Sequence, residues 1–202
     1  MADYDVITLD EAKTALNMDV DTDTFDDELA MYVTAVSERL DDLCGYIVAR
    51  DVTDELHAGG DAVIWPAQQP VASITSVKEY ASGVATTLTA ETLTVAGDYV
   101  LDNAGTHNAR IRRRSSWADR TFNLGPVVVS YRAGRFESTD EVSAKFKQAA
   151  AKTLAWLWKG DQGAGSATFG AADDTSLFGL GFALPNVVVE MLAFERRPPS
   201  IA

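Results

Sequence analysis

The sequence predicts an α+β fold, mainly an α-helical bundle with a small antiparallel β-sheet insertion between the second and third main helices. Three observations lead to this fold class. Apolar residues recur at three- and four-residue steps early in the chain, β-rich runs separated by Gly and Pro fill the middle, and helical spacing then returns. With 202 residues, the chain has the size of one domain.

We expect this single domain, residues 1–202, to have five parts. They are the N-terminal helices (1–46), a β-rich insert (47–135), a long helix (136–160), a flexible loop rich in Gly, Ala, Ser and Asp (161–184), and a C-terminal helix with a tail (185–202).

Two helices are predicted before the β-rich insert. Thr8 and Glu11 have the spacing of a capping box, which places a short helix near 9–17. A longer helix follows, because apolar residues recur at helical steps from Phe25 to Leu43. Acidic residues crowd its first turn, where the helix dipole favours negative charge, and Gly45 suits its C-terminal end.

The insert contains short runs of β-forming residues bounded by turn residues. These runs are Ala62–Trp65, Val71–Tyr80, Thr86–Val95, Tyr99–Leu101, Ala109–Arg113 and Val127–Tyr131. Their spacing indicates an antiparallel meander. Such a small sheet does not stand alone, so we expect it to pack on the helices.

Helical spacing returns after Asp140 and continues to about Gly160. A last helix begins near Pro185, a residue suited to a first helical turn. Its small apolar face and its cationic end come before the prolines that stop it. These positions are Val188, Met191 and Leu192, then Arg196 and Arg197, and finally Pro198 and Pro199.

The formal charge of −13 is unevenly distributed. Residues 1–61 hold 17 acids and 3 bases, whereas the rest of the chain holds 13 acids and 14 bases. A chain this acidic repels phosphate backbones, so tight non-specific DNA binding is not expected. Two interpretations of the acidity stay open: solubility alone, or an acidic surface that faces a partner or lines a channel.

We expect no enzymatic activity, no metal and no cofactor. The run Asp19, Asp21, Asp23 is similar to the start of a calcium loop, but Thr24 and Ala30 stand where that loop needs Gly and Glu. No phosphate loop and no nucleophile elbow occur. A hydrolase or metal enzyme outside these motifs stays as a remote alternative.

The remaining candidates for chemistry are isolated. His57 and His107 both lie beside glycines and have the context of turn residues. Cys44 is the only cysteine, which excludes an internal disulfide. No run of about 18 apolar residues is present and the N-terminus is acidic, so we expect a soluble protein made in the cytoplasm with no membrane partner.

One basic run departs from the general acidity: Arg110, Arg112, Arg113 and Arg114, with Trp117 and Arg120 nearby. It allows three interpretations: contact with passing nucleic acid, pairing with the acidic part of a neighbouring subunit, or a solvated face. Trp156 and Trp158 cannot share one helix face. We expect Trp156 in the core and Trp158 at a contact with another subunit or with the channel lumen.

The order of several segments resembles the head–tail connector (adaptor, or head-completion) proteins of long-tailed double-stranded DNA phages. The segments are ITLDEAKTALNM, DDELAMYVTAVSERLDDLCGY, WPAQQPVASITSVKEY, GDYVLDNAG, VVVSYRAG, EVSAKFKQAAAKTLAWLW and LPNVVVEMLAFERR, which together cover most of the chain.

This resemblance implies a structural subunit of the phage neck, in the virion. Such subunits form a ring, usually a dodecamer, that binds the portal protein and extends the DNA channel. The ring offers a docking surface for a stopper or tail-completion protein, while genomic DNA passes without specific binding. A tail-terminator or tail-completion protein of the same neck is the alternative.

By the same resemblance, the C-terminal helix and tail engage the portal. A tail that bears arginines and is stopped by proline also suits capture in a groove. The residues expected to dock are Val188, Met191, Leu192, Phe194, Arg196, Arg197, Pro198 and Ile201.

Overall fold

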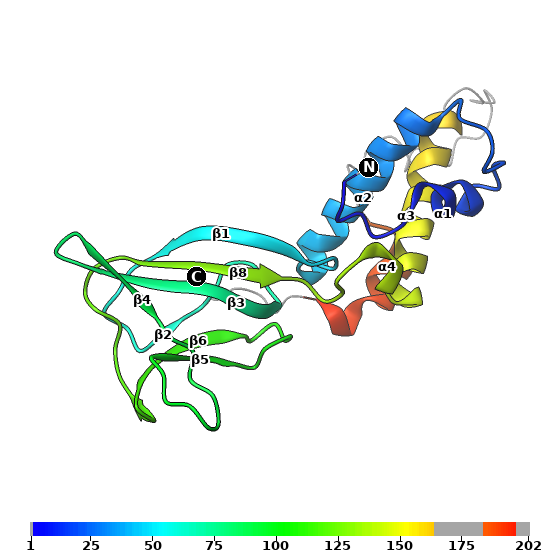
Figure 1. Ribbon diagram of the computed structural model, residues 1–202. Helices are drawn as coiled ribbons and strands as arrows, with labels where there is room; N and C mark the ends of the chain where they lie inside the picture. Colours follow the sequence, from blue (N-terminus) through cyan, green and yellow to red (C-terminus); the bar gives the residue numbers. More distant parts are fainter. Residues whose placement is uncertain (1, 164–183, 197–202) are drawn as a thin grey trace, which may run out of the picture. The chain divides into compact units, whose positions relative to one another are not determined.

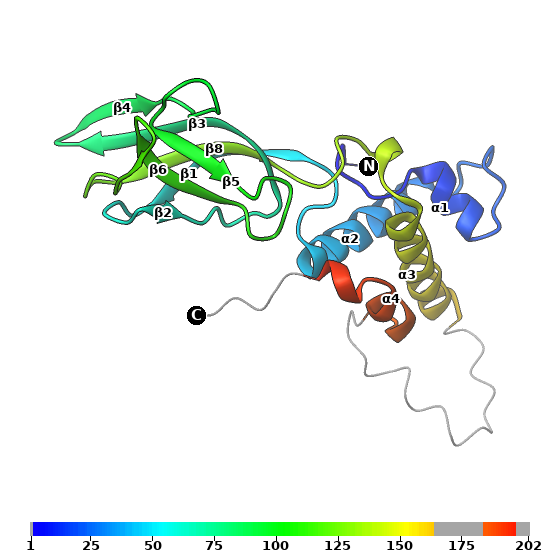
Figure 2. The same ribbon diagram turned by 90° about the horizontal axis from the view of Figure 1, so that it is seen from below.

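The computed structural model describes residues 2–163 and 184–196, and the chain divides into two compact units (Figures 1 and 2). The helical unit runs to Cys44 and resumes from Ser138 to Arg196, and the sheet unit is Gly45–Glu137. The α+β class is confirmed, with helices in one unit and antiparallel sheets in the other.

The helical unit contains the predicted helices. They are α1 (Leu9–Ala15), α2 (Asp26–Cys44), α3 (Ala144–Gly163) and α4 (Asn186–Met191), with short 3-10 turns η1 (Thr139–Glu141) and η2 (Ala193–Glu195). The capping box is confirmed: the Glu11 amide donates to Thr8 Oγ1 at 3.2 Å, and the Thr8 amide donates to Glu11 Oε2 at 2.9 Å. The α3 helix continues to Gly163, three residues into the loop predicted for 161–184. Residues 164–183 of that predicted loop lie outside the part of the chain that the structure describes.

The apolar stripes of these helices form the core of the helical unit. The α2 helix contacts α1 and α3, and α4 contacts α3. The buried side chains recur at the expected helical steps, which explains why the sequence predicts this unit well. They include Leu29, Val33, Val36 and Leu40 of α2, Phe146, Ala150 and Leu154 of α3, and Val188 of α4.

The sheet unit contains eight strands among the described residues. They are β1 (Arg50–His57), β2 (Val63–Ile64), β3 (Val71–Ala81), β4 (Val84–Leu88), β5 (Tyr99–Asp102), β6 (Arg110–Ser115), β7 (Ala118–Asp119) and β8 (Val127–Ala133). One sheet has the order β1-β8-β3-β4, and the other has the order β2-β6-β5 with β7 also paired to β6 (Figure 1). The pairings between these strands are all antiparallel.

The prediction of a mainly helical bundle with a small sheet is wrong, because the described residues hold nearly as much strand as helix. The sequence misses β1, whose alternation is broken by Asp51, Asp54 and Glu55. Asp54 has a positive φ of 54°, and the register with β8 shifts between Val52 and Glu55. A bulge of this kind hides the period of two that identifies a strand.

The predicted meander is also wrong. The β8 strand lies between β1 and β3, and β2 pairs with β6, so these neighbours in the sheets are distant in the chain, whereas β3–β4 and β5–β6 are consecutive strands. The β8 strand takes a central place because every second residue, from Val127 to Ala133, is buried. The predicted run to Val95 ends earlier, since β4 stops at Leu88.

The sheet unit has a hydrophobic core of its own. Buried residues of both sheets join in one cluster, so the apolar side chains of each sheet cover those of the other. The cluster includes Val71, Val77, Val127, Val129 and Tyr131 from the first sheet, and Ile64, Tyr99 and Ile111 from the second. This differs from the expectation that the insert depends on the helices for its core.

Candidate functional site

The described part of the chain shows surfaces and polar clusters instead of a metal centre. Among residues 2–163 and 184–196, no three His, Cys, Asp or Glu side chains gather as metal ligands. In the same residues, no helix has the length and apolar character of a bilayer span. The candidate sites are therefore the predicted docking residues, the arginine run and a pocket beside it.

The arginine run lies on β6, and carboxylates of the same unit balance it. Arg110 Nε lies 3.3 Å from Asp102 Oδ2, and Arg112 Nη2 lies 3.0 Å from Asp102 Oδ1. Arg114 Nε lies 3.0 Å from Glu91 Oε1, and its Nη1 also contacts Asp119. The expected alternation along the strand therefore gives a row of internal ion pairs.

Arg113 points to the other side of β6 and joins a buried polar network. Its Nε donates to Glu79 Oε1 at 2.9 Å, and Asn123 Nδ2 donates to Glu79 Oε2 at 3.0 Å. Glu79 is only 2% exposed, and its carboxylate needs these partners in place of water. Because Glu79 is on β3 and Arg113 is on β6, the network connects the two sheets.

None of the three interpretations of the arginine run included this network. The carboxylates that balance the run come from β3, β5, β7 and the loop after β4, so sequence proximity does not reveal them. The predicted contact of Arg110, Arg112, Arg113 and Arg114 with another subunit or with the lumen stays a prediction. The structure gives these residues partners inside their own unit.

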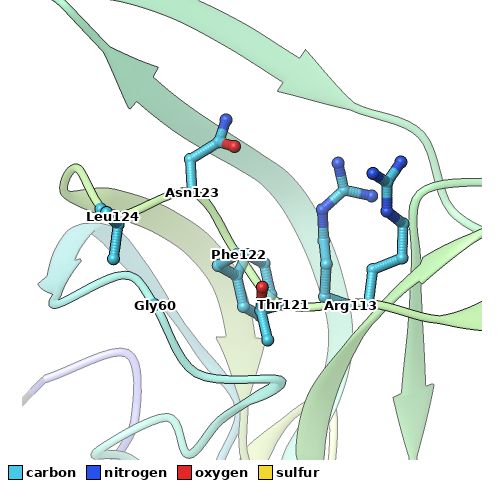
Figure 3. Close-up of a pocket in the computed structure, with 7 residues that line it drawn as sticks. Gly60, Arg113, Thr121, Phe122, Asn123 and Leu124 are labelled. Carbon is cyan, nitrogen blue, oxygen red and sulfur yellow. The ribbon is translucent and has the colours of Figure 1, made fainter.

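A pocket of about 300 Å³ adjoins this network (Figure 3). Its lining comes from Gly60, from Arg113, and from the segment between Arg120 and Leu124. Leu124 and Arg113 lie at opposite ends of the row of labelled side chains in Figure 3. Gly125 allows the segment to approach β3 closely, because a Cβ atom at this position would lie only 1.9 Å from the Tyr80 carbonyl oxygen.

A second polar cluster surrounds Glu55. Tyr131 Oη donates to Glu55 Oε2, His57 Nε2 lies 2.6 Å from Glu55 Oε1, and the Ala67 amide donates to the same oxygen at 2.9 Å. Burial alone would raise the pKa of Glu55, but these hydrogen bonds together lower it. Burial also raises the pKa of Tyr131. The cluster connects β1 to β8, and His57 takes part in it through its contact with Glu55.

The predicted docking residues on the C-terminal helix separate into two groups. Val188 and Leu192 are buried in the helical unit, and Met191 is half-buried. Phe194 is 100% exposed and Arg196 is exposed, while Lys145 pairs with Glu195 between them. The other predicted residues, Arg197, Pro198 and Ile201, lie outside the described residues.

Trp158 lies in the core of the helical unit. It is 8% exposed, and its ring meets Phe25 and Tyr32 edge-on at centroid distances of 5.8 and 5.7 Å. Trp156 is half-buried, so Trp158 is the more deeply buried of the two tryptophans within the unit. The contact of Trp158 with another subunit stays a prediction, while its packing against α2 gives it a role within the unit.

Sequence reasoning named Trp117 and Arg120 only as neighbours of the arginine run. In the structure, residues 116–121 are all exposed, and Leu124 is 94% exposed. Ser116 and Trp117 form a tight turn in which both φ angles are positive. Asn and Gly usually occupy such a turn, so Ser-Trp gives no sequence signal for it.

A second exposed segment lies in the helical unit. Residues 19–25 are all exposed and contain Asp19, Asp21 and Asp23. The buried Lys13 holds this segment, since its Nζ donates to the Val20 carbonyl at 3.1 Å and lies 2.7 Å from Asp26 Oδ1. Asp19, Asp21 and Asp23 thus belong to an exposed segment that contacts of Lys13 hold in place.

No protein-family model and no curated protein matches the chain. Among solved structures, the chain is similar to one from the neck of an empty GTA particle, computed with C6 symmetry, at 16% identity and a TM-score of 0.63. It is also similar to one from the neck of a native GTA particle, computed with C12 symmetry, at 18% identity and a TM-score of 0.53. Each match covers 98% of this chain and 92% of the other. Because the matches span nearly the whole chain, the folds of both units are present in each of those chains.

Proposed function

We propose that the chain is a structural subunit of the neck of a tailed, phage-like particle. The observation that carries this proposal is the extent of the structural match, which covers 98% of the chain and therefore includes both units. The matched chains come from the necks of GTA particles. The resemblance of the ordered sequence segments to connector proteins supports the same assignment independently of the fold.

The subunit would form an adaptor ring of twelve copies. The two matched necks were computed with C6 and C12 symmetry, and twelve copies satisfy both symmetries. In this role the ring binds the portal, extends the DNA channel, and offers a docking surface for a stopper or tail protein. A closed ring requires two different surfaces on each copy, one for each neighbour.

The end of the helical unit is the proposed portal-docking element. Val188 in α4 and Leu192 just after it are buried in the helical unit, so they hold the residues that follow at a defined position on that unit. Phe194 presents a whole aromatic ring to solvent, and Arg196 is exposed beside it. Aromatic residues and Arg are enriched in the centres of protein interfaces, where their burial contributes most of the affinity.

The charge of the helical unit suits a channel through which DNA slides. Over its sequence this unit carries 20 acidic and 7 basic residues, a net charge of −13. A channel lined by a negatively charged surface does not neutralise the phosphates of DNA, so DNA that passes through it is not bound strongly. We propose that the subunit acts without catalysis or a cofactor, is made in the host cytoplasm, and is incorporated at the neck.

Deletion of the gene, followed by electron microscopy of the particles, tests this function. We expect DNA-filled heads without tails, and we expect the intact gene to restore complete particles. Phe194→Ala should reduce that restoration at least about ten-fold, as loss of an interface anchor does. Val84→Ala, which shortens another exposed apolar side chain, should restore particles normally.

Two outcomes would change the assignment. Complete, infectious particles that lack the chain would overturn the neck function. A gold-labelled chain found at the far end of detached tail tubes, and not on heads, would replace the adaptor role by the tail-terminator or tail-completion role.

A further inference from the structure

We propose that residues 116–124 of the sheet unit bind the acid-rich segment 19–25 of a second copy of the chain. The inference rests on the proposed function, in which copies stand side by side in a ring. It names the two surfaces that such a ring requires. One surface lies in the sheet unit and carries Arg120 with exposed apolar side chains, and the other is acidic and lies in the helical unit.

The first surface displays residue types that are enriched at interfaces. Residues 116–121 are exposed throughout, Trp117 is 48% exposed, and Leu124 at the rim of the pocket is 94% exposed. Asp119 is balanced by Arg112 and Arg114. Arg120 forms no ion pair within the described part of the chain, so this segment offers a cation that is flanked in the sequence by the exposed side chains of Trp117 and Leu124.

The turn at Trp117 is held in a conformation that side chains rarely adopt. The φ angles are 50° at Ser116 and 71° at Trp117, in the left-handed region. The Trp117 amide donates to Glu91 Oε2 at 2.9 Å, and its carbonyl accepts from Arg114 Nη2 at 2.6 Å. Backbone strain of this kind persists only where the surroundings enforce it, and it is concentrated at binding sites.

The second surface has the complementary composition. Asp19, Asp21 and Asp23 form no ion pairs among the described residues, and they alternate with the exposed side chains of Val20 and Thr22. Phe25, at the end of the segment, is 42% exposed. The segment therefore offers three carboxylates and two apolar side chains to a surface that carries Arg120, Trp117 and Leu124.

Both segments are ordered before they meet. The Glu91–Arg114 ion pair holds the turn at Trp117, and Lys13 holds the carbonyl of Val20. Surfaces that are already in their bound conformation lose little freedom on association, so a small contact area gives measurable affinity. The helical unit has a net charge of −13 and the sheet unit −1, so a contact between unlike units also avoids the repulsion between two helical units.

Cysteine cross-linking between separate full-length chains tests the contact. One variant carries Thr121→Cys and the other carries Thr24→Cys, both at exposed positions that leave Arg120 and the three aspartates in place, while the native Cys44 is buried. The matched control replaces the Thr24 variant by Lys152→Cys, at an exposed position of α3. Under mild oxidation we expect the Thr121–Thr24 pair to form a disulfide-linked dimer at least about ten times faster than the control pair, since association raises the local concentration.

The outcomes are distinct. Equal rates for the two pairs would overturn the inference. So would a fast disulfide within one chain, in place of a dimer, when both substitutions are made in the same chain. Adding Trp117→Ala to the Thr121→Cys chain should lower the rate to that of the control, whereas an unchanged rate would contradict the role of the turn.

The proposed function fails or stands separately from this contact. If cross-linking is fast while particles assemble normally without the chain, the contact stands and the neck function fails. If deletion removes tails while cross-linking rates are equal, the neck function stands and the contact between these two segments is wrong.

Discussion

The helical unit carries 20 acidic and 7 basic residues along its sequence, whereas the sheet unit carries 10 and 9. In the sheet unit most arginines are paired internally, as Arg113 is with Glu79. In the helical unit, acids such as Asp19, Asp21 and Asp23 remain on the surface without ion pairs among the described residues. Most arginines of the sheet unit thus stabilise its own fold, whereas these three acids of the helical unit contribute negative charge to its surface.

The two units also differ in how their cores are specified. The helical unit depends on apolar stripes that lie close together in the sequence, such as Leu29 to Leu40 on α2. The sheet unit depends on contacts between distant residues, among them the network of Glu79, Arg113 and Asn123. Substitutions placed in one unit at a time show whether this difference is real.

Removal of the buried carboxylate should have the largest effect. Glu79→Ala leaves the Arg113 guanidinium without its main partner in a nearly dry place, so we expect a loss of about 3 to 5 kcal/mol in the free energy of unfolding. Hydrogen–deuterium exchange should show the loss in strands β3, β6 and β8 and not in α2. Glu38→Ala, at an exposed acid in the middle of α2, is the control and should cost less than about 0.5 kcal/mol. Equal effects of the two substitutions would contradict the structural role of the network.

A cavity in the other core should act on the other unit. Leu154→Ala removes a fully buried side chain of α3 and should cost about 2 to 5 kcal/mol, depending on how far the site relaxes. Amide exchange should rise in α1, α2 and α3 and stay unchanged in β8. Leu124→Ala, the same substitution at an exposed position, should have almost no effect on stability. A parallel rise in both units would show that they unfold as one.

A smaller effect is expected at the start of α1. Thr8→Ala removes the side chain that accepts from the Glu11 amide, and loss of such a cap costs about 1 kcal/mol. Denaturant titration followed by circular dichroism measures this change. Thr22→Ala, at an exposed threonine with no capping contact in the structure, provides the comparison. A loss as large for Thr22→Ala would argue against the cap.

The smallest expected effect is a change in stability with pH that has opposite signs in the two units. Hydrogen bonds lower the pKa of Glu55, so its contribution to the sheet unit is present above the ordinary value of 4.5 and is lost as the pH falls through the lower folded value. Burial raises the pKa of Asp5, so its protonated form favours the folded helical unit, and that contribution is lost as the pH rises above 3.8. Acidification should therefore weaken the sheet unit first.

Amide exchange at neutral pH and at about pH 4, corrected for intrinsic rates, measures this difference. Protection should fall in β1 and β8 while it is retained in α2. Glu55→Gln should reduce the pH dependence in the strands, and Asp5→Asn should reduce it in the helices. A uniform fall across both units would contradict the assignment.

The helices could be predicted from the sequence because their determinants are local. The capping box at Thr8 and the apolar stripe of α2 lie within the helices that they specify or directly beside them. Runs such as Val71–Tyr80 and Val127–Tyr131 were also correctly predicted as strands. The α+β class follows from these elements alone.

The strand order and the candidate sites depend on long-range contacts. Nothing near β8 in the sequence shows that it lies between β1 and β3, and nothing near Arg113 shows that Glu79 is its partner. The exposed turn at Trp117 was missed for a similar reason, since Glu91 and Arg114 hold it in place of the usual Gly or Asn. The burial of Trp158 follows from contacts with Tyr32 on α2 and with Phe25 just before it.

A cryo-electron microscopy reconstruction of the neck of the particles made with this chain tests the central claim most directly. We expect twelve copies in a ring against the portal, with the density around Phe194 on the portal and residues 116–124 of each copy against residues 19–25 of the next. A resolved neck in which no density fits either unit would contradict the account.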